Sequence, residues 1–244
     1  MSPADDERAF LATYDPTAFE RPSVSVDVVI LTADDDALHA LLVRRDALPQ
    51  RGRWALPGGF VRASESLEEA ALRVLNDKGG LRDVYLEQLY TFGRPDRDPR
   101  MRVLSVAYVA LVAHARLPPL AEGRALCTLH VPWSGEAGGP VMVLGEGGRP
   151  LPLAFDHGEM LAMAVKRLRG KLDYTPIGYQ LLPPHFSLRD LQTVHETILG
   201  RALNKDSFRR RMLASGELEA TGEREQAVGH RPAELYRFVH RSAL

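Results

Sequence analysis

The residues best suited to chemistry lie between Gly59 and Leu81, where acidic side chains recur at helical spacing. Residues four apart share one helix face, so side chains at positions 74 and 78 would lie together, with position 77 beside them. Carboxylates there would form a Mg²⁺ site, because Mg²⁺ prefers oxygen ligands and can activate water against a diphosphate. The chain instead carries Val74 and Lys78, with Asp77 as the remaining acid. Only one of these three positions therefore offers a carboxylate to a metal.

The order of residues in this segment resembles the Nudix box of pyrophosphate hydrolases, G-x5-E-x7-R-E-U-x-E-E-x-G-U, where U is a bulky aliphatic residue. Matching residues are Gly59, Glu65, Arg73, Leu75, Gly80 and Leu81. The acidic positions of the pattern hold Val74, Asp77 and Lys78 instead. We therefore expect neither a resident metal nor hydrolase activity.

Several acidic residues of the segment leave a second interpretation open. They are Glu65, Glu68, Glu69 and Asp77. A weak or rearranged metal site could use them. Glu68 and Glu69 equally suit the first turn of a helix, where the macrodipole favours acids. Glu65 is expected to pair with Arg73 and hold the loop of the box, which is a structural role.

Length, charge and cysteine content set the broad class. The chain has 244 residues, enough for one large domain or two small ones, and its hydrophobic share of 45% is that of a globular protein. A formal net charge of -1 means that any nucleic-acid surface must be local. Cys127 is the only cysteine, which excludes an internal disulfide and fits a reducing cytoplasm. The sequence has no apolar run of about 18 residues, so no membrane span is expected. Met1–Arg8 is acidic and lacks the basic and then apolar segments of a signal peptide.

The first part of the chain alternates strand and helix patterns. Strands are expected from β-branched and alternating runs at Val24–Thr32, Leu38–Arg44, Val84–Phe92 and Val103–Ala113. Helices are expected from Ser64 or Glu65 to Gly79-Gly80, and from Asp156 or His157 to about Leu172. Residues 114–150 are rich in Gly and Pro, and we interpret them as loop with a strand at Val141–Leu144.

The tail changes character after Tyr174–Pro184, which we interpret as a linker because three prolines interrupt regular elements. The elements expected beyond it are a helix begun by a capping box of Ser187 and Asp190, a turn at Gly200–Leu203, a helix Lys205–Ser215 capped by Asn204, and strands Glu217–Thr221 and Glu234–Val239 around the loop Gly222–Ala233. Two short helices and a hairpin in this order are typical of a winged helix-turn-helix domain.

The second tail helix carries a basic face. Phe208 and Met212 form its apolar stripe, and on a helical wheel Arg209 and Arg210 point away from that stripe. Such a face, together with the wing loop Gly222–Ala233, would suit binding to the phosphates and grooves of DNA. The candidate DNA-binding residues are Lys205, Ser207, Arg209, Arg210, Arg211, Arg224, His230 and Arg231. A basic face that is merely solvated is the alternative interpretation.

Together these features resemble the NrtR family, the Nudix-related transcriptional regulators of NAD metabolism. The resemblance covers about residues 20–240 and rests on the runs WALPGGF (Trp54–Phe60), TFGRPDRDPR (Thr91–Arg100), LAFDH (Leu153–His157), FSLRDLQ (Phe186–Gln192), SFRRRM (Ser207–Met212) and RPAELYRF (Arg231–Phe238). It implies an α+β chain, with a Nudix-like α/β/α sandwich followed by a winged helix-turn-helix domain. The implied division is an N-terminal arm at 1–22, a ligand-sensing domain at 23–173, a linker at 174–186 and a DNA-binding domain at 187–244.

The resemblance also implies a function. The chain would be a transcriptional regulator, expected to be a repressor, rather than an enzyme. ADP-ribose would be its effector, usually weakening DNA binding, and no cofactor would be required. The protein would be a cytoplasmic homodimer that reads a palindromic double-stranded operator near genes of NAD biosynthesis or salvage.

An ADP-ribose pocket needs cations for the diphosphate and an aromatic or apolar surface for adenine. Arginines lie before and after the box, and Phe60 or Phe92 could contact the base. The candidate ligand-binding residues are Arg44, Arg45, Arg53, Phe60, Glu65, Phe92, Arg97, Asp98, Arg100 and Asp156. Each arginine could equally be an ordinary surface charge, and Asp156 and His157 could instead cap their helix.

Two other functions stay open at this point. One is an active Mg²⁺-dependent ADP-ribose pyrophosphatase whose tail binds another protein. It requires Asp77 with Glu65 and Glu69 to hold Mg²⁺ beside a lysine. The other is a bifunctional protein that hydrolyses slowly and also binds DNA.

Overall fold

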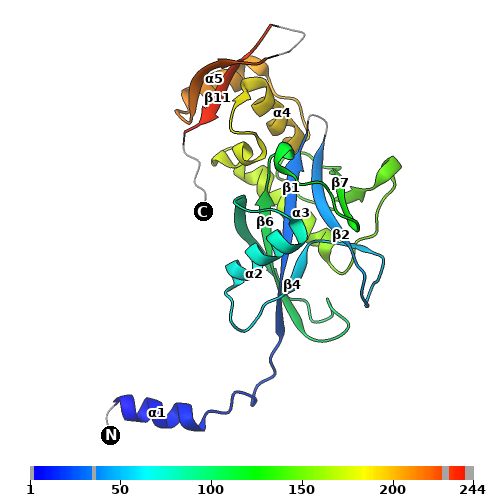
Figure 1. The fold of residues 1–244 in the computed structure, drawn as a ribbon, viewed down its shortest axis with the longest axis vertical. Coiled ribbons are helices and arrows are strands. Elements are labelled where there is room, and N and C mark those ends of the chain that lie inside the picture. The colour runs from blue at the N-terminus through cyan, green and yellow to red at the C-terminus, as the bar shows by residue number, and fades with distance from the viewer. Residues whose placement is uncertain (1–2, 35–36, 227–230, 240–244) are drawn as a thin grey trace.

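An eight-stranded mixed sheet forms the first domain in the computed structural model, which describes residues 3–34, 37–226 and 231–239 (Figure 1). The central strand β1 (Ser23–Ala33) runs parallel to β6 (Val103–Leu111) and antiparallel to β2 (Leu38–Arg44). The remaining strands are β5 (Tyr85–Phe92) beside β6, β7 (Arg124–His130) beside β2, β8 (Met142–Leu144) beside β7, β3 (Trp54–Ala55) beside β2 and β4 (Gly58–Phe60) beside β1.

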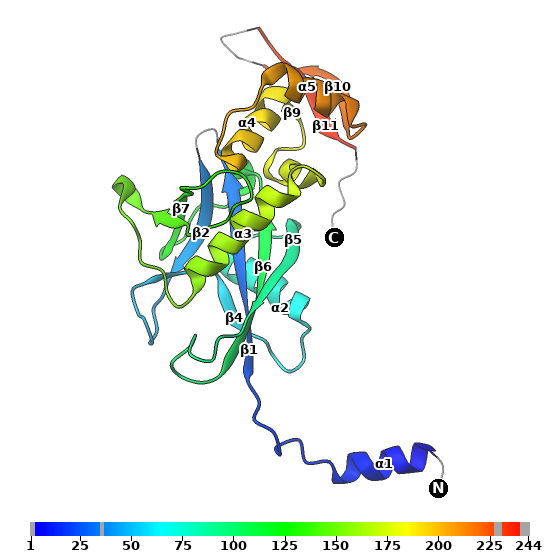
Figure 2. The ribbon, with the colours of Figure 1, turned by 180° about the vertical axis from the view of Figure 1, so that it is seen from behind.

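Helices cover both faces of this sheet. α2 (Leu67–Val74) and α3 (His157–Lys171) lie on opposite sides, as Figures 1 and 2 show from the front and from behind. Successive residues of β1 face them alternately, so Val28 belongs to the apolar cluster with α2 and Val29 to the cluster with α3. A strand buried on both faces has a nearly continuous apolar sequence, which explains the run VSVDVVILT. The predicted α/β/α sandwich is confirmed.

A winged helix domain follows. Its elements are η4 (Pro176–Leu181), β9 (Phe186–Ser187), α4 (Leu188–Leu199), α5 (Lys205–Ala214), β10 (Leu218–Arg224) and β11 (Glu234–Phe238). Ser187 and Asp190 form the predicted capping box of α4, and Asn204 caps α5. Gly200 ends α4 with a φ of 67°, the left-handed conformation that favours glycine. Strand β11 pairs with both β9 and β10, which ties the wing to the start of α4.

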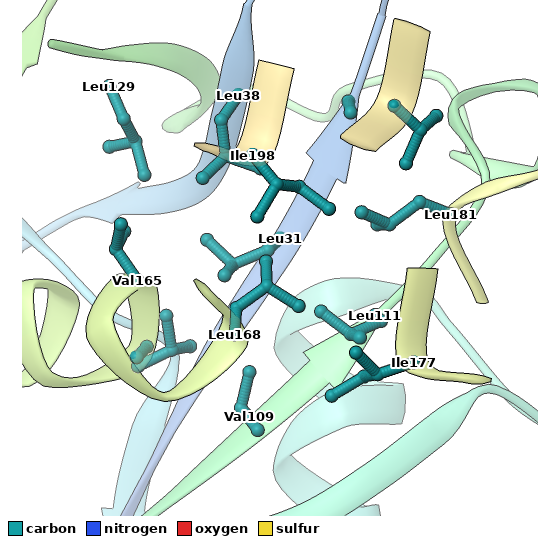
Figure 3. Close-up of a cluster of buried hydrophobic side chains, with 14 of the residues drawn as sticks. Leu31, Leu38, Val109, Leu111, Leu129, Val165, Leu168, Ile177, Leu181 and Ile198 are labelled. Carbon is teal, nitrogen blue, oxygen red and sulfur yellow. The ribbon is translucent and has the colours of Figure 1, made fainter. Parts of the chain in front are cut away.

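One hydrophobic core joins the two domains. Figure 3 shows Leu31 of β1, Leu168 of α3 and Ile198 of α4 gathered in it. The same buried cluster reaches Phe208 of α5 and Phe238 of β11. The winged helix domain is therefore packed as a continuation of the first domain and not as a separate module.

A buried arginine adds polar contacts at the same junction. Arg169 of α3 is 2% exposed, and its Nε donates to the carbonyl oxygen of Ile198 at 2.5 Å. Its guanidinium also donates to the carbonyl oxygen of Trp133 and lies 4.4 Å from the centre of that indole ring. Burial lowers the pKa of Arg169. These contacts fix the end of α4 against the end of α3.

Two segments differ from the prediction. The segment expected as an irregular linker contains the 3-10 helix η4, whose Ile177, Tyr179 and Leu181 are buried in the shared core. The prolines exclude an α-helix, but Pro176 suits the first position of a short helical turn. Residues 114–150, expected mostly as loop, contain β7 and the 3-10 turns η2 (His114–Arg116) and η3 (Glu146–Gly148).

The helix of the Nudix box also departs from the expected geometry. It begins after Ser66, which forms a capping box with Glu69, and not at Ser64 or Glu65. Its last turn, η1 (Leu75–Gly79), is a π-helix. Positions 77 and 78 therefore do not continue a regular α-helical face.

An N-terminal helix was not predicted. α1 (Pro3–Thr13) has no buried residue and lies away from the rest of the chain (Figures 1 and 2). Neither α1 nor any other helix in the described part of the chain combines the length and apolar content needed to cross a bilayer.

Substitution of Ile198 by alanine tests the shared core. The Ile198→Ala variant should lose about 2–5 kcal/mol in its free energy of unfolding, because a cavity replaces a large buried side chain. Urea unfolding should still give one transition, whether followed by circular dichroism or by the fluorescence of Trp54 and Trp133. Leu213→Ala, on a side chain of α5 that is 45% exposed, is the matched control and should change stability by less than about 0.5 kcal/mol. Separate transitions in the two signals would contradict a single core.

Candidate functional site

A cleft of about 640 Å³ is lined by β1, the end of β2, β4, the loop after β5 and the start of α3. It brings together the predicted ligand-binding residues Arg44, Arg45, Phe60, Arg97, Asp98 and Arg100. It adds residues that were not among the candidates, including Asp27, Lys78, Arg124, Phe155 and His157. Side chains far apart in the sequence thus meet in one concave site.

The remaining candidates do not line this cleft. Glu65 accepts a hydrogen bond of 2.8 Å from the Nε of Arg73, and this pairing lowers the pKa of Glu65 to about 2. Phe92 is buried in the hydrophobic core, because its position in β5 faces the sheet interior. Arg53 is exposed and donates to a backbone carbonyl at 3.5 Å. Asp156 is buried and faces Arg97.

Arg97 is the centre of a buried charge cluster in the wall of the cleft. It donates two hydrogen bonds to Asp156, at 2.9 and 2.7 Å, and lies 4.0 Å from Asp27. Asp27 also accepts a hydrogen bond from the hydroxyl of Ser105. The bidentate pair with Arg97 occupies both oxygens of Asp156. The side chain of Asp156 therefore holds this arginine and makes no capping hydrogen bond to α3.

His157 completes the cluster. Its Nδ1 accepts a hydrogen bond from the backbone N–H of Leu56 at 2.8 Å, so the proton of the neutral ring is on Nε2, 3.7 Å from Asp27. Burial lowers the pKa of His157, and the ring is neutral at pH 7. Gly58 lets β4 approach this cluster, because a Cβ at that position would lie 1.9 Å from Oδ1 of Asp27.

The cleft carries an excess of positive charge. Six basic and four acidic side chains line it. Arg100 is paired with Asp98 at 2.7 Å. Four cations of the cleft make hydrogen bonds to backbone carbonyls and, within the described part of the chain, pair with no carboxylate: Arg44, Arg45, Lys78 and Arg124. An anionic ligand would meet charge that the protein does not itself neutralise.

Two phenylalanine rings line the cleft. Phe60 is exposed and lies 5.8 Å from the guanidinium of Arg100. Phe155, absent from the candidates, lies 4.8 Å from the guanidinium of Arg45. The φ of Phe155 is 50°, which is rare for a residue other than glycine. Its backbone N–H donates a hydrogen bond of 3.0 Å to the side-chain oxygen of Gln50. The run LAFDH was the only sequence signal for Phe155.

The residues of the box do not fit a divalent metal. Val74 is fully buried in an apolar cluster, and the ammonium of Lys78 donates to the carbonyl oxygen of Gly58. Glu69 is engaged in the capping box with Ser66. Among the described residues, no group of three or more His, Cys, Asp or Glu is placed to hold a metal ion. The carboxylates of the Nudix pattern are thus replaced or used in other contacts.

A second groove, of about 840 Å³, lies between α4, α5 and the wing. Phe208 of α5 is buried, whereas Arg209 and Arg210 are exposed as the helical wheel predicted. The basic residues that line the groove are Arg189, Lys205, Arg209, Arg224 and Arg231. Of these, Arg189 on the first turn of α4 was not among the candidates.

Of the other DNA-binding candidates, Ser207, Arg210 and Arg211 do not line this groove. Arg211 faces the first domain, with its guanidinium 3.7 Å from the carboxylate of Asp173. Ser207 is at the start of α5, where its backbone N–H donates to Asn204. His230 lies outside the described residues.

A buried histidine supports α5 from behind. The ring of His195 is 5.1 Å from that of Phe208, in an edge-to-face arrangement. In the described structure its Nδ1 is buried without a hydrogen-bond partner. Burial lowers the pKa of His195 to about 4, so the ring packs as a neutral group at pH 7.

The fold and the two basic surfaces define a Nudix-related DNA-binding regulator. The model of the NUDIX domain matches residues 21–133, and the model of the NrtR DNA-binding winged helix domain matches residues 178–238. Over 235 residues the chain is 39% identical to the ADPR responsive transcriptional repressor NtrR of Acinetobacter baylyi, covering 96% of this chain and 88% of that protein. The chain belongs to the NrtR family.

Solved structures agree with this assignment. The crystal structure of Shewanella oneidensis NrtR complexed with a 27mer DNA is 33% identical, with a TM-score of 0.73 over 88% of this chain and 93% of that one. The NUDIX domain of the same Shewanella protein, complexed with ADP ribose, is 34% identical, with a TM-score of 0.51 over 69% of this chain and 99% of that one.

Removal of the Arg97 guanidinium should destabilise the first domain. In Arg97→Met the carboxylates of Asp27 and Asp156 would remain buried without their cation, so we expect a loss of about 3–5 kcal/mol at pH 7. Arg100→Met is the matched control, because the side chain of Arg100 is 41% exposed, and its effect should be below about 1 kcal/mol. Urea unfolding measures both. Equal and small losses would show that Arg97 does not hold the cluster.

Stability should fall in acid partly through His195. The pKa of His195 is below its ordinary value in the folded chain, so the unfolded chain binds more protons once the pH drops below about 6.5. The contribution of the neutral His195 ring to the free energy of unfolding is fully present above that pH and is lost as the pH falls toward 4. Between about pH 7 and pH 4.5, the wild type should lose about 2 kcal/mol more than His195→Leu.

Urea unfolding at both pH values gives this difference. His185→Leu is the control for replacing a histidine elsewhere in the same domain, because the side chain of His185 is 47% exposed. Parallel stability losses in wild type and His195→Leu would contradict the assignment. His157, whose pKa is also lowered by burial, contributes in the same direction and is present in all three proteins.

Proposed function

We propose that this chain is a transcriptional repressor that binds operator DNA and responds to ADP-ribose through a Nudix domain without hydrolase activity. It acts in the cytoplasm as a homodimer on a palindromic operator. The regulated genes are those of NAD biosynthesis or salvage. The observation that carries this proposal is that one core joins a cationic ligand-sized cleft to a winged helix with a basic face.

The cleft supports the effector part of the proposal. Its volume of about 640 Å³ is in the range of small-molecule sites. Cations without a carboxylate partner suit a diphosphate, and Phe60 and Phe155 offer surfaces for a base. The Acinetobacter relative is named for its response to ADPR, and the Shewanella domain was crystallised with ADP ribose.

The winged helix supports the DNA part. α5 is held from below by Phe208 and presents Arg209 and Arg210 to solvent. Arg224 and Arg189 place further positive charge beside it, on the wing and on α4. Arginines on a second helix of this kind suit phosphates and guanine edges in the major groove. The Shewanella NrtR was crystallised with DNA.

The box supports a ligand-binding role without hydrolysis. Val74 and Lys78 stand where the Nudix pattern has acids, so no side chain there can help to hold the ion that would activate water. Incubation with ADP-ribose and Mg²⁺ should therefore release no AMP. Robust Mg²⁺-dependent release of AMP would favour the pyrophosphatase alternative.

Helix α3 supplies a physical connection between the two surfaces. Its start carries Asp156 and His157 at the cleft, and its end carries Arg169 against α4. We propose that ADP-ribose shifts this helix and with it the spacing of the two DNA-binding helices in the dimer, which weakens operator binding.

The experiment that tests the proposed function is a selection of bound fragments from genomic DNA of the source organism, with and without ADP-ribose. Enrichment of a palindrome near NAD genes, lost on addition of ADP-ribose, is the expected result. Enrichment that ignores ADP-ribose would reject the effector, and no enrichment would reject the repressor.

A substitution of Arg209 tests the DNA-binding role of α5. Arg209→Ala should weaken operator binding by about 1–3 kcal/mol, measured by fluorescence anisotropy at fixed salt, because a direct base or phosphate contact is lost. ADP-ribose affinity should be unchanged. Arg237→Ala is the matched control, since Arg237 is an exposed arginine of the same domain that pairs with Glu219. Equal effects of the two variants would place the DNA away from α5.

A further inference from the structure

The ammonium of Lys78 stands in the part of the cleft where the Nudix box would place carboxylates. Lys78 lies in the turn η1 at the end of the box helix, and its Nζ donates to the carbonyl oxygen of Gly58 in strand β4. Its side chain lines the cleft together with Arg44 and Arg124. The contact with Gly58 holds this charge at the cleft instead of leaving it free in solvent.

Neighbouring contacts fix the turn that carries Lys78. The guanidinium of Arg124 donates to the carbonyl oxygen of Asp77 at 2.9 Å, and Gly80 closes the π-turn with a φ of 71°. The carboxylate of Asp77 accepts a hydrogen bond from Asn76 at 3.1 Å and does not line the cleft. The one acid retained at these positions is therefore directed to another contact, and the lysine is the group directed to the cleft.

The sign of the charge at this place decides how a diphosphate can bind. A group of carboxylates repels a diphosphate until a divalent cation neutralises them. An ammonium attracts it directly, and of the three N–H donors of Lys78 two remain for the ligand while one is given to Gly58. Val74 is packed among apolar side chains, so it supplies no oxygen for a metal that would compete with the ammonium.

We propose that Lys78 is a built-in counter-cation that contacts the diphosphate of the effector in place of a divalent metal. This inference rests on the proposed function, because it takes the ligand of the cleft to be a nucleoside diphosphate sugar. Effector binding then needs no divalent metal and is unaffected by a chelator. The same residue that retains the ligand also leaves the cleft without the ion that would promote its cleavage.

The test is the affinity of the full chain for ADP-ribose, measured by titration calorimetry in EDTA and again in excess MgCl₂. The wild type should bind equally well in both, within about twofold. Lys78→Met keeps the aliphatic stem and removes the charge, and it should weaken binding by about tenfold or more in both buffers, the usual effect of losing a charged hydrogen bond. Lys78→Arg should restore most of the affinity, which a purely steric role would not predict.

Arg82→Met is the matched control. Arg82 is an exposed cation just beyond the same turn, bonded to Asn76 at 2.7 Å and outside the cleft, so its loss should leave ADP-ribose affinity unchanged. Wild-type binding that requires Mg²⁺, or undiminished binding by Lys78→Met in EDTA, would overturn the role of Lys78 and leave the effector assignment intact. No binding of ADP-ribose by the wild type in either buffer would overturn the proposed function itself.

Discussion

The packing of helix α3 on the central sheet, with its end against the winged helix domain, is the interaction on which both candidate sites depend. At the start of this helix, Asp156 and His157 hold the buried cluster around Arg97. Near its end, Arg169 is bonded to the carbonyl oxygen of Ile198 in α4. Packed cores resist gradual compression, so a displacement of α3 at the cleft would move α4 with it. We propose that this packing is the route by which the cleft acts on the DNA-binding helix.

Charge serves two purposes in the cleft. Arg97 is buried and paired with carboxylates, so it shapes the wall and stabilises the fold. Arg44 and Lys78 have no carboxylate partner within the described structure, so their charge is available to a ligand. The pair of Arg73 and Glu65 preserves the loop of the box while the metal-binding positions have changed. The Nudix framework can therefore persist as a binding site without the requirements of hydrolysis.

Local patterns predicted most of the fold, because strand runs and helix caps depend on neighbours in sequence. The capping box of Ser187 and Asp190 is an example. The partners of the site could not be predicted in this way, since Asp156 meets Arg97 from 59 residues away. Phe92, predicted to contact the base, lies in the hydrophobic core, because alternation in a strand does not tell which buried face meets a cavity. The π-turn at the end of the box helix also has no periodic signature.

Coupling between the cleft and the DNA-binding helix is the central claim, and thermodynamic linkage makes it measurable. The most direct measurement is the affinity of the chain for ADP-ribose, first free and then saturated with operator DNA. Binding free energies must be coupled equally in both directions. We expect operator-bound protein to bind ADP-ribose about 5–150-fold more weakly, by the same factor by which ADP-ribose weakens operator binding. Identical ADP-ribose affinities for free and operator-bound protein would contradict the coupling.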